Sequence, residues 1–500
     1  MERSALIKLK ADLYTDLRDF VSFFDTGGVD HEHGSFCCGL SHTGARLSGL
    51  KFVWFNGRGI WVYSRLHNTG LLRAESAPRG GSTMDDYLLG VARGAVKFVL
   101  ANGRDADGAW VVETDASGGV LKPAEPNYIP TSGYGSAFIA EGLGEYALAT
   151  GDASALELAL DILRSFITMM DDPNRPGDRG PWPCCYPGMR LLGHHMICLN
   201  LARGLWDAVS ELRRRGLPSP CLDGNAAEAT LAELDLILNR MIDAILGPFV
   251  HPKYGLLTET LDHEYARPAD ANEDLCYLGH AIETMWMLMA EAERREDEGL
   301  YARAAALFRR HVDSAWDPLC GGLFRGVYMR EWHYLIDADA KVKWEHDEVI
   351  VGCLMLLAHP PVGADGDGGD GDGGDGDGGA KSGDGDGGAK SADGDGGAKV
   401  GDGGAAEQAD GGESMVSWAG RCLRRVLEYN ERAFSLRSLR PGSWKVGGDR
   451  FAKPEPNAEG ISGYNMGCAS LPNRVEHYHL PRMLMSGIRL CDEAIAKAAP

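Results

Sequence analysis

The stretch LGHAIETMW (residues 278–286) sets polar and aromatic side chains at helical spacing in an otherwise apolar run. His280, Glu283 and Trp286 are three residues apart, so a helix would place them on one side. Histidine titrates near neutral pH and can take up and return a proton, and a carboxylate bonded to its ring fixes the tautomer and raises the basicity. A satisfied structural His–Glu pair gives the same pattern. The stretch alone leaves proton transfer and a structural pair both open.

Further clusters of polar and aromatic residues interrupt other apolar runs. Separate histidines with glutamate partners suit a reaction in which one group removes a proton and another returns it. Aromatic rings beside an arginine suit a sugar, because flat apolar faces stack on sugar rings and a guanidinium donates to hydroxyls. An arginine whose stem packs on the surface is the alternative. The clusters contain Arg58 with Trp54, Trp61 and Tyr63; His195 and Asn200; Trp344 and Glu348; and His477, His479 and Arg482.

The sequence motifs give little support for a metal site or a nucleotide-binding site. HEH (31–33) and HYH (477–479) have the spacing of paired ligands on a strand, but a metal site needs three or four ligands. HExxH and Cys/His arrays are absent, so we expect no metal. The phosphate-binding loops GxxxxGK[ST] and strand-associated GxGxxG are missing, and SGYGS (132–136) lacks the spacing of a serine nucleophile elbow.

Half of the net charge of −22 lies in one low-complexity segment, which carries 12 Asp, 2 Glu and 3 Lys between Gly363 and Glu413. Its Gly and Asp residues have almost no apolar surface to bury, and calcium-binding repeats would need a recurring large apolar residue. We therefore expect residues 363–413 to be a disordered insertion within a single domain that spans 1–500. The mildly acidic remainder offers no basic surface for nucleic acid.

Targeting and redox signals favour the cytoplasm. The N-terminus MERSALIKLKADLYTDLRDF has no apolar core of a signal peptide, and no run of 18 apolar residues predicts a membrane span. The 12 cysteines form no CxxC pair, which is typical of reduced thiols. We expect a cytoplasmic protein that binds neither nucleic acid nor membrane.

Apolar residues recur at helical spacing in about twelve segments, so we expect an all-α protein. Between them, DHEHGSF (30–36), DADGAWV (105–111), HPKYGLL (251–257) and DPLCGGLF (317–324) share an Asp or His, a short turn, a Gly and an apolar strand. Such turns between helical hairpins predict an (α/α)6 toroid with short β-turn loops at one end. The expected helices are 4–24, 50–68, 83–102, 133–150, 152–171, 191–215, 223–246, 272–293, 296–315, 341–358, 414–436 and 478–497.

Five ordered motifs resemble the N-acylglucosamine 2-epimerase family, which includes renin-binding proteins, cellobiose 2-epimerases and aldose–ketose isomerases. HGSF with KFVWFNGRGIWVYSRL is similar to its Gly-Gly-Phe and Trp-x-x-Gly-Arg-x-x-Trp stretches, and LGHAIETMW to its Gly-His-x-x-Glu-x-x-Trp. DPLCGGLF, KWEHDEVIVGCLMLL and HYHLPRML resemble its Asp-Pro-x-x-Gly-Gly-Leu-Phe, Trp-Trp-x-x-x-Glu and His-x-Pro-Arg motifs. The resemblance runs from Asp30 to Leu484, apart from the insertion.

The resemblance implies a role for each candidate residue. His280 and His479 would be the acid/base pair on opposite sides of the sugar C2 atom, and Glu283 and Glu348 would bind or orient. Arg58 would hold the oxygens at C1 and C2. The remaining implied contacts with substrate are Asn200, Trp286, Trp344 and Arg482.

These roles predict an enzyme that interconverts N-acetylglucosamine and N-acetylmannosamine by removing and returning the C2 proton. Asn200 replaces the His of the cellobiose enzymes, which favours a monosaccharide. An aldose–ketose isomerase on the same scaffold, an (α/α)6 glycoside hydrolase that uses Glu283 and Glu348, and a non-catalytic renin-binding-like protein are the alternatives. We expect no required cofactor. The resemblance leaves open a homodimer and an allosteric nucleotide such as ATP, whose site no motif marks.

Overall fold

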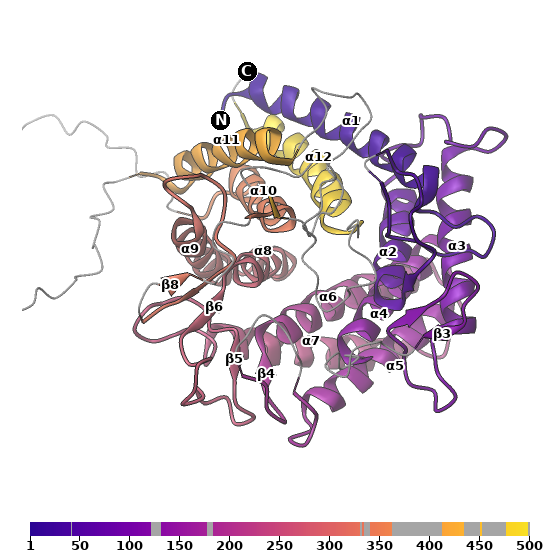
Figure 1. Cartoon of the computed structure of the whole chain (residues 1–500), viewed down its shortest axis with the longest axis horizontal. Coiled ribbons are helices and arrows are strands. Elements are labelled where there is room, and N and C mark those ends of the chain that lie inside the picture. Colours follow the sequence, from indigo (N-terminus) through magenta and orange to yellow (C-terminus); the bar gives the residue numbers. More distant parts are fainter. Residues whose placement is uncertain are drawn as a thin grey trace, which may run out of the picture.

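A computed structural model describes residues 1–41, 43–121, 132–177, 184–330, 333–334, 341–362, 413–434, 451–452 and 477–498. The expected insertion, apart from Glu413, lies outside these residues. All twelve expected helices are present, which confirms an all-α fold (Figure 1). Their bounds are α1 Arg3–Gly27, α2 Val53–Thr69, α3 Met84–Asn102, α4 Ser132–Thr150, α5 Ala153–Met170, α6 Leu192–Arg214, α7 Gly224–Leu246, α8 Leu278–Arg295, α9 Glu298–Ala315, α10 Lys343–Ala358, α11 Met415–Phe434 and α12 His479–Lys497.

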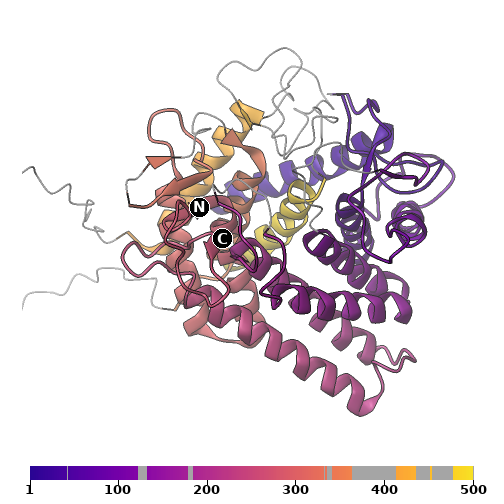
Figure 2. The ribbon, with the colours of Figure 1, turned by 60° about the horizontal axis from the view of Figure 1, so that its bottom comes forward.

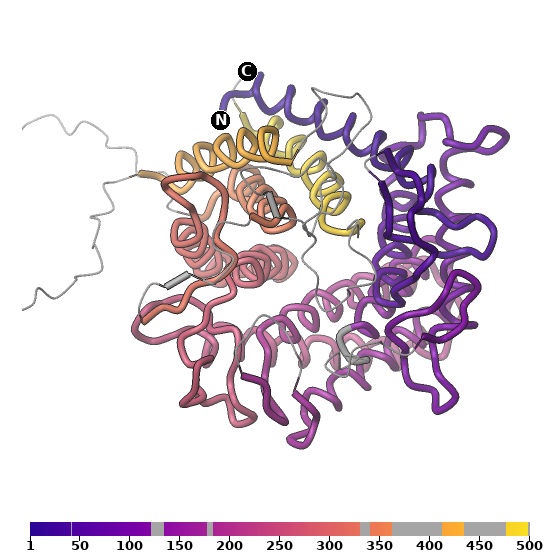
Figure 3. Tube along the Cα trace, viewed as in Figure 1, coloured from indigo at the N-terminus to yellow at the C-terminus, as the bar shows by residue number. Residues whose placement is uncertain are grey.

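The helices form two concentric rings. The inner ring runs α2, α4, α6, α8, α10, α12, and α12 returns to α2; each inner helix packs mainly against one outer helix, with α1 covering α12. Figures 1 and 3 show this closed path around one axis, and Figure 2 shows it obliquely, after a turn of 60°. The (α/α)6 toroid is therefore confirmed. None of the helices in the described ranges has the length and apolar character of a membrane span.

Short antiparallel strands introduce most inner helices at one end of the toroid. Four inner helices begin later than the periodicity predicts, because buried strand residues precede them: Lys51–Phe52 (β1), Arg190–Leu191 (β4), Leu275–Tyr277 (β6) and Lys341–Val342 (β9). β1 pairs with β2 (Glu113–Thr114), which pairs with β3 (Val120–Leu121); β4 pairs with β5 (Thr260–Leu261), β6 with β7 (Gly326–Tyr328), β7 with β8 (His333–Tyr334), and β9 with β10 (Phe451–Ala452). These pairings fix where each inner helix begins.

The recurring turns have the conformation that their residue types predict. The side chains of Asp30, Asp105 and Asp317 each accept the backbone N–H two residues later, and His251 Nδ1 does the same. The turn glycines, such as Gly34 at φ +78°, lie in the left-handed region. The four turns are thus built alike, as expected.

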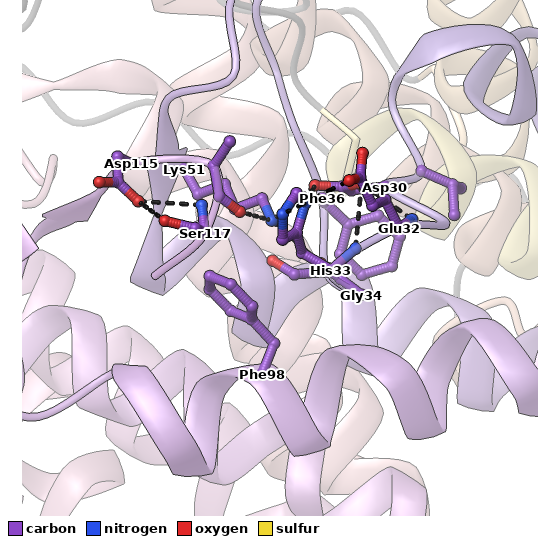
Figure 4. Close-up of polar contacts among 12 residues, drawn as sticks. Asp30, Glu32, His33, Gly34, Phe36, Lys51, Phe98, Asp115 and Ser117 are labelled. Carbon is purple, nitrogen blue, oxygen red and sulfur yellow. Dashed lines mark hydrogen bonds and ion pairs between the residues drawn. The ribbon is translucent and has the colours of Figure 1, made fainter. Parts of the chain in front are cut away.

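A buried lysine ties the first turn to the strand that enters α2 (Figure 4). Lys51 Nζ lies 2.8 Å from Asp30 Oδ2, donates to the carbonyl of Gly34 at 3.1 Å, and sits 4.0 Å from the centre of the Phe98 ring. Burial would raise the pKa of Asp30, but the ion pair with Lys51 outweighs it and lowers that pKa to about 2. Lys341 repeats the arrangement before α10 with Asp317 at 2.9 Å and the Phe324 ring.

Inner helices are also pinned to these turns by a side chain one turn into the helix. In α2, Asn56 donates to the carbonyl of Phe52 and accepts the N–H of Phe36, both at 2.8 Å. In α10, His346 bonds the carbonyl of Val342 at 2.8 Å through Nδ1 and accepts the N–H of Leu323 at 3.1 Å. The same double contact therefore comes from an amide in one repeat and an imidazole in another.

Three buried histidines, one of them His346, should make the fold sensitive to acid. Burial lowers the pKa of His195 and His346 to about 3 and that of His311 to about 4. The unfolded chain takes up these protons near pH 6.5, so the stabilisation present above that pH is lost as the pH falls. Between pH 6.5 and 5 each histidine contributes a loss of up to about 2 kcal/mol.

His346→Asn tests this dependence, because Asn56 makes both contacts with an amide. Urea unfolding at pH 7.5 should show a loss of about 1–3 kcal/mol from the smaller side chain. The further loss between pH 7.5 and 5.0 should shrink by up to about 2 kcal/mol relative to the parent chain. Equal pH dependence in both proteins would contradict the account.

Candidate active site

The N-termini of the inner helices meet at the end of the toroid that carries the turns. His280 is the third residue of α8, Trp344 the second of α10 and His479 the first of α12. The short strands end directly before α8 and α10, which sets the height of these side chains along the axis. Three of the predicted residues from distant parts of the sequence are thus brought to one place.

His280 has a carboxylate partner, but the partner is not Glu283. Its Nδ1 lies 3.0 Å from Oε1 of Glu259, a residue with no exposed side-chain area. Burial lowers the pKa of His280, yet the charge and hydrogen bond of Glu259, with smaller contributions from Glu283 and Glu345, outweigh burial and raise that pKa above its usual value. His280 is therefore protonated more readily than a histidine without these carboxylates.

His479 belongs to a different ionic cluster, centred on Arg482. His479 Nδ1 lies 2.7 Å from Glu348 Oε1, and the same oxygen accepts from Arg482 Nη2 at 2.7 Å. Arg482 Nη2 also donates to Glu283 and lies 3.1 Å from His479 Nδ1. Burial raises the pKa of Glu348 while Arg482 opposes the rise. One guanidinium thus offsets two buried carboxylates beside this histidine.

Trp344 links the two histidines. Its ring centre lies 6.0 Å from that of His280 and 5.0 Å from that of His479. Close packing between α8 and α10 requires Gly279, since a Cβ there would lie 2.5 Å from the Trp344 ring. The glycine of the Gly-His pair therefore allows the two helix N-termini to approach.

A second polar layer lies on the other side of Arg482. Trp286 Nε1 donates to Glu348 Oε2 at 2.7 Å. Asn200 donates to Glu141 Oε1 at 2.8 Å, and the Tyr478 hydroxyl donates to the same oxygen at 2.6 Å. Asn200 is thus held by Glu141 in this structure, one layer away from the histidines.

Arg58 reaches this layer from α2. Its guanidinium carbon lies 4.1 Å from the centre of the Phe138 ring and 4.9 Å from that of Tyr478. Gly57 permits the approach of α2 to α4, because a Cβ there would lie 2.6 Å from the backbone of Phe138. Arg58 is buried among aromatic rings rather than lying on the surface.

A cavity of about 730 Å³ opens at the opposite end of the toroid, between the C-terminal halves of the inner helices. Asn200, Trp286 and Arg482 line its inner end. The polar layer therefore separates this cavity from the histidines.

Glu283, Glu348 and His479 have ligand atoms close enough together to hold a metal ion. Arg482 Nη2 donates to both of these carboxylates, however, so a cation already occupies the place between them. The donor set fits an ion pair better than a metal.

Several residues that shape the site were missed by sequence reasoning: Glu259, Glu141, Tyr478 and Glu345. Glu259 follows Leu256 and Leu257 in a strand-like stretch, and a carboxylate flanked by buried residues is a usable signal. Nothing in the sequence marked Glu345 as a site residue, because it follows Trp344 at the start of a helix, where acidic residues are common. Its proximity to His280 depends on the tertiary fold.

Comparisons with known proteins identify relatives of this chain. The family model for N-acylglucosamine 2-epimerase (GlcNAc 2-epimerase) matches residues 229–362, which include both α8 and α10. The N-acylglucosamine 2-epimerase of Homo sapiens is 24% identical over 384 residues, covering 71% of this chain and 75% of that protein. The Bos taurus enzyme is 25% identical over 368 residues, covering 71% and 76%. The chain belongs to the N-acylglucosamine 2-epimerase family. It is accordingly an isomerase of the epimerase class.

Solved structures share the toroid over nearly the whole chain. Cellobiose 2-epimerase from Spirochaeta thermophila has a TM-score of 0.62 at 15% identity, covering 98% of each chain. A D-mannose isomerase has a TM-score of 0.59 at 13% identity, covering 97% of each. At such identities the likeness concerns the fold of this family member and leaves its substrate open.

Glu345 should make the fold less stable as the pH rises from about 5 toward 8. Neither of its oxygens has a hydrogen-bond partner among the described residues, and burial raises its pKa to about 8, against smaller opposing effects of Arg325, His280 and Lys341. The folded protein holds this proton where the unfolded chain has lost it, so the stability contribution falls as the pH rises toward 8. Glu345→Gln should therefore raise Tm by a few degrees at pH 8 relative to its effect at pH 5.5. Calorimetry checks this, with exposed Glu431→Gln as control; a pH-independent difference would contradict it.

Proposed function

We propose that this chain interconverts N-acetylglucosamine and N-acetylmannosamine by proton transfer at C2 of the ring-opened sugar. The observation that carries the proposal is that His280 and His479 come from different inner helices, lie against the same Trp344 ring and have separate carboxylate partners. Two acid/base groups on different elements suit a reaction that removes a proton on one face and returns one on the other.

The surroundings of the two histidines support different resting states. The main charges acting on His280 are carboxylates, which favour its protonated form. His479 shares the carboxylate of Glu348 with Arg482, whose positive charge offsets part of the negative charge beside this ring. We assign His479 as the base that removes the C2 proton first and His280 as the acid that returns one. The reverse reaction uses the opposite protonation.

Removal of the C2 proton leaves an enediolate-like anion in this proposal. The inner helices direct their N-termini toward this end, and each N-terminus carries a partial positive charge. Arg58 and Arg482 add two buried guanidiniums. Fixed positive charge that needs no reorganisation stabilises such an intermediate. No redox cofactor is needed, because electrons are neither gained nor lost.

The substituent at C2 of the sugar decides which products can form. An N-acylamino group at C2 cannot become a ketone without leaving an enamide or imine, so only reprotonation at C2 is productive. A 2-hydroxy sugar could instead be reprotonated at C1, which would give a ketose. The chemistry of the substrate therefore separates epimerase from isomerase.

Incubation of candidate sugars in D2O, followed by NMR, tests the substrate. N-Acetylglucosamine and N-acetylmannosamine should interconvert with one deuteron placed at C2. Mannose and glucose should give little fructose, and cellobiose little product. Rapid fructose formation from mannose, with N-acetylmannosamine inert, would replace the epimerase by an aldose–ketose isomerase.

Substitution of each histidine tests whether each one transfers a proton on one face of C2. His280→Asn and His479→Asn should each lower net epimerisation by about 10²-fold or more, with unchanged circular dichroism. Each single variant should still exchange the C2 proton of one epimer with D2O, because the remaining histidine serves its own face. Full turnover in either variant would remove that histidine from the mechanism.

A further inference from the structure

We propose that Glu259 is the positioning residue of His280: it holds Nδ1–H, aims Nε2 toward the substrate and stabilises the imidazolium. This extends the proposed function, on which its kinetic part rests, to a residue outside the motifs that mark the family. The contact joins two elements that are separate in sequence, with Glu259 directly before β5 and His280 in the first turn of α8.

The backbone of Glu259 is fixed on both sides. Its N–H donates to the carbonyl of Leu275 at 2.8 Å, directly at the strand that leads into α8. Its carbonyl accepts the N–H of Leu192, the first residue of α6, at 2.9 Å. Glu259 is therefore clamped between the N-termini of two inner helices. A carboxylate on such a frame can set the orientation of a ring to within hydrogen-bond tolerance.

The carboxylate of Glu259 is buried, and only one of its oxygens makes a hydrogen bond within the described residues. Its side chain has no exposed area, and its second oxygen has no hydrogen-bond partner among the described residues. A buried carboxylate is unfavourable unless it is paired, because water no longer solvates its charge. In the described part of the chain, His280 supplies the hydrogen bond that compensates Glu259. A residue selected only for packing would be apolar here, between Leu257 and Leu261.

The groups that face His280 come from four elements. Glu283 lies on its own helix and Glu345 on α10, and both act on it through charge, while Tyr277 packs on the ring at 4.6 Å between centres. Gly193 of α6 lies under the ring, since a Cβ there would approach it to 3.1 Å. Only Glu259 makes a hydrogen bond to the imidazole among the described residues, so it alone selects the tautomer.

The direct test is 15N NMR of histidine-labelled protein, with the His280 signals assigned by their loss in His280→Asn. In the parent chain the neutral ring should carry its proton on Nδ1. Glu259→Gln should lower the pKa of His280 by about one unit or more, since a neutral amide no longer stabilises the cation. Glu259→Asp, which keeps the charge, should restore part of the shift. Glu113→Gln removes a buried strand carboxylate of another hairpin and should leave the His280 signals in place.

Proton exchange at C2 gives the kinetic test. In His479→Asn, where His280 alone exchanges the proton, Glu259→Gln should slow exchange by about tenfold or more. In His280→Asn, the same substitution has no histidine to act through, and exchange should change by less than about twofold. The basic limb of kcat/KM against pH should move to lower pH in Glu259→Gln.

The results for Glu259 and for the sugar can fail independently of each other. An unshifted His280 pKa in Glu259→Gln, or a neutral ring protonated on Nε2 in the parent chain, would overturn the positioning role. Should Glu259→Gln fail to fold, the tautomer in the parent chain and the titration of Glu259→Asp still decide it. Titration as predicted, with no sugar exchanged, would retain Glu259 and reject the proposed function.

Discussion

The buried ion cluster around Arg482 is the interaction on which the rest of the site depends. One guanidinium from α12 joins Glu283 of α8 to Glu348 of α10, and Glu348 in turn holds both His479 and Trp286. Removal of Arg482 would leave two buried carboxylates uncompensated, which is far more costly than the loss of a surface pair. Three inner helices are thus held in register by a contact whose members also serve the histidine.

The ring of helices imposes a polarity that suits this cluster. Because every inner helix runs in the same direction, their N-termini gather at the end with the turns, while the cavity lies at the other end. Positive partial charge at the N-termini favours anions and offsets part of the cost of carboxylates buried there. Buried acids such as Glu259 and Glu345 can therefore be tolerated close to His280.

The sequence predicted the helices and turns better than the hydrogen-bond partners of the site residues. Helical periodicity located all twelve helices, and the Asp-turn-Gly pattern located the turns, because both are local properties. The inner helices were predicted to begin too early, since strand residues such as Leu275 and Cys276 are as apolar as helix residues. The site motifs named His280 and His479 but attached His280 to Glu283. Its partner Glu259 is 21 residues away, and only the strand pairing brings it near.

The same distinction explains why two histidines in one pocket need not be equivalent. Helical spacing relates His280 to Glu283, and His479 to Arg482, equally well. In three dimensions His280 contacts the carboxylate of Glu259, directly before a strand, whereas His479 shares the carboxylate of Glu348 with the guanidinium of Arg482. A carboxylate stabilises imidazolium and a guanidinium opposes it, so the two rings lie in different electrostatic surroundings before any substrate arrives. An enzyme that must be acid on one face and base on the other can use such a difference, and here the difference arises from the elements that supply the neighbouring charges.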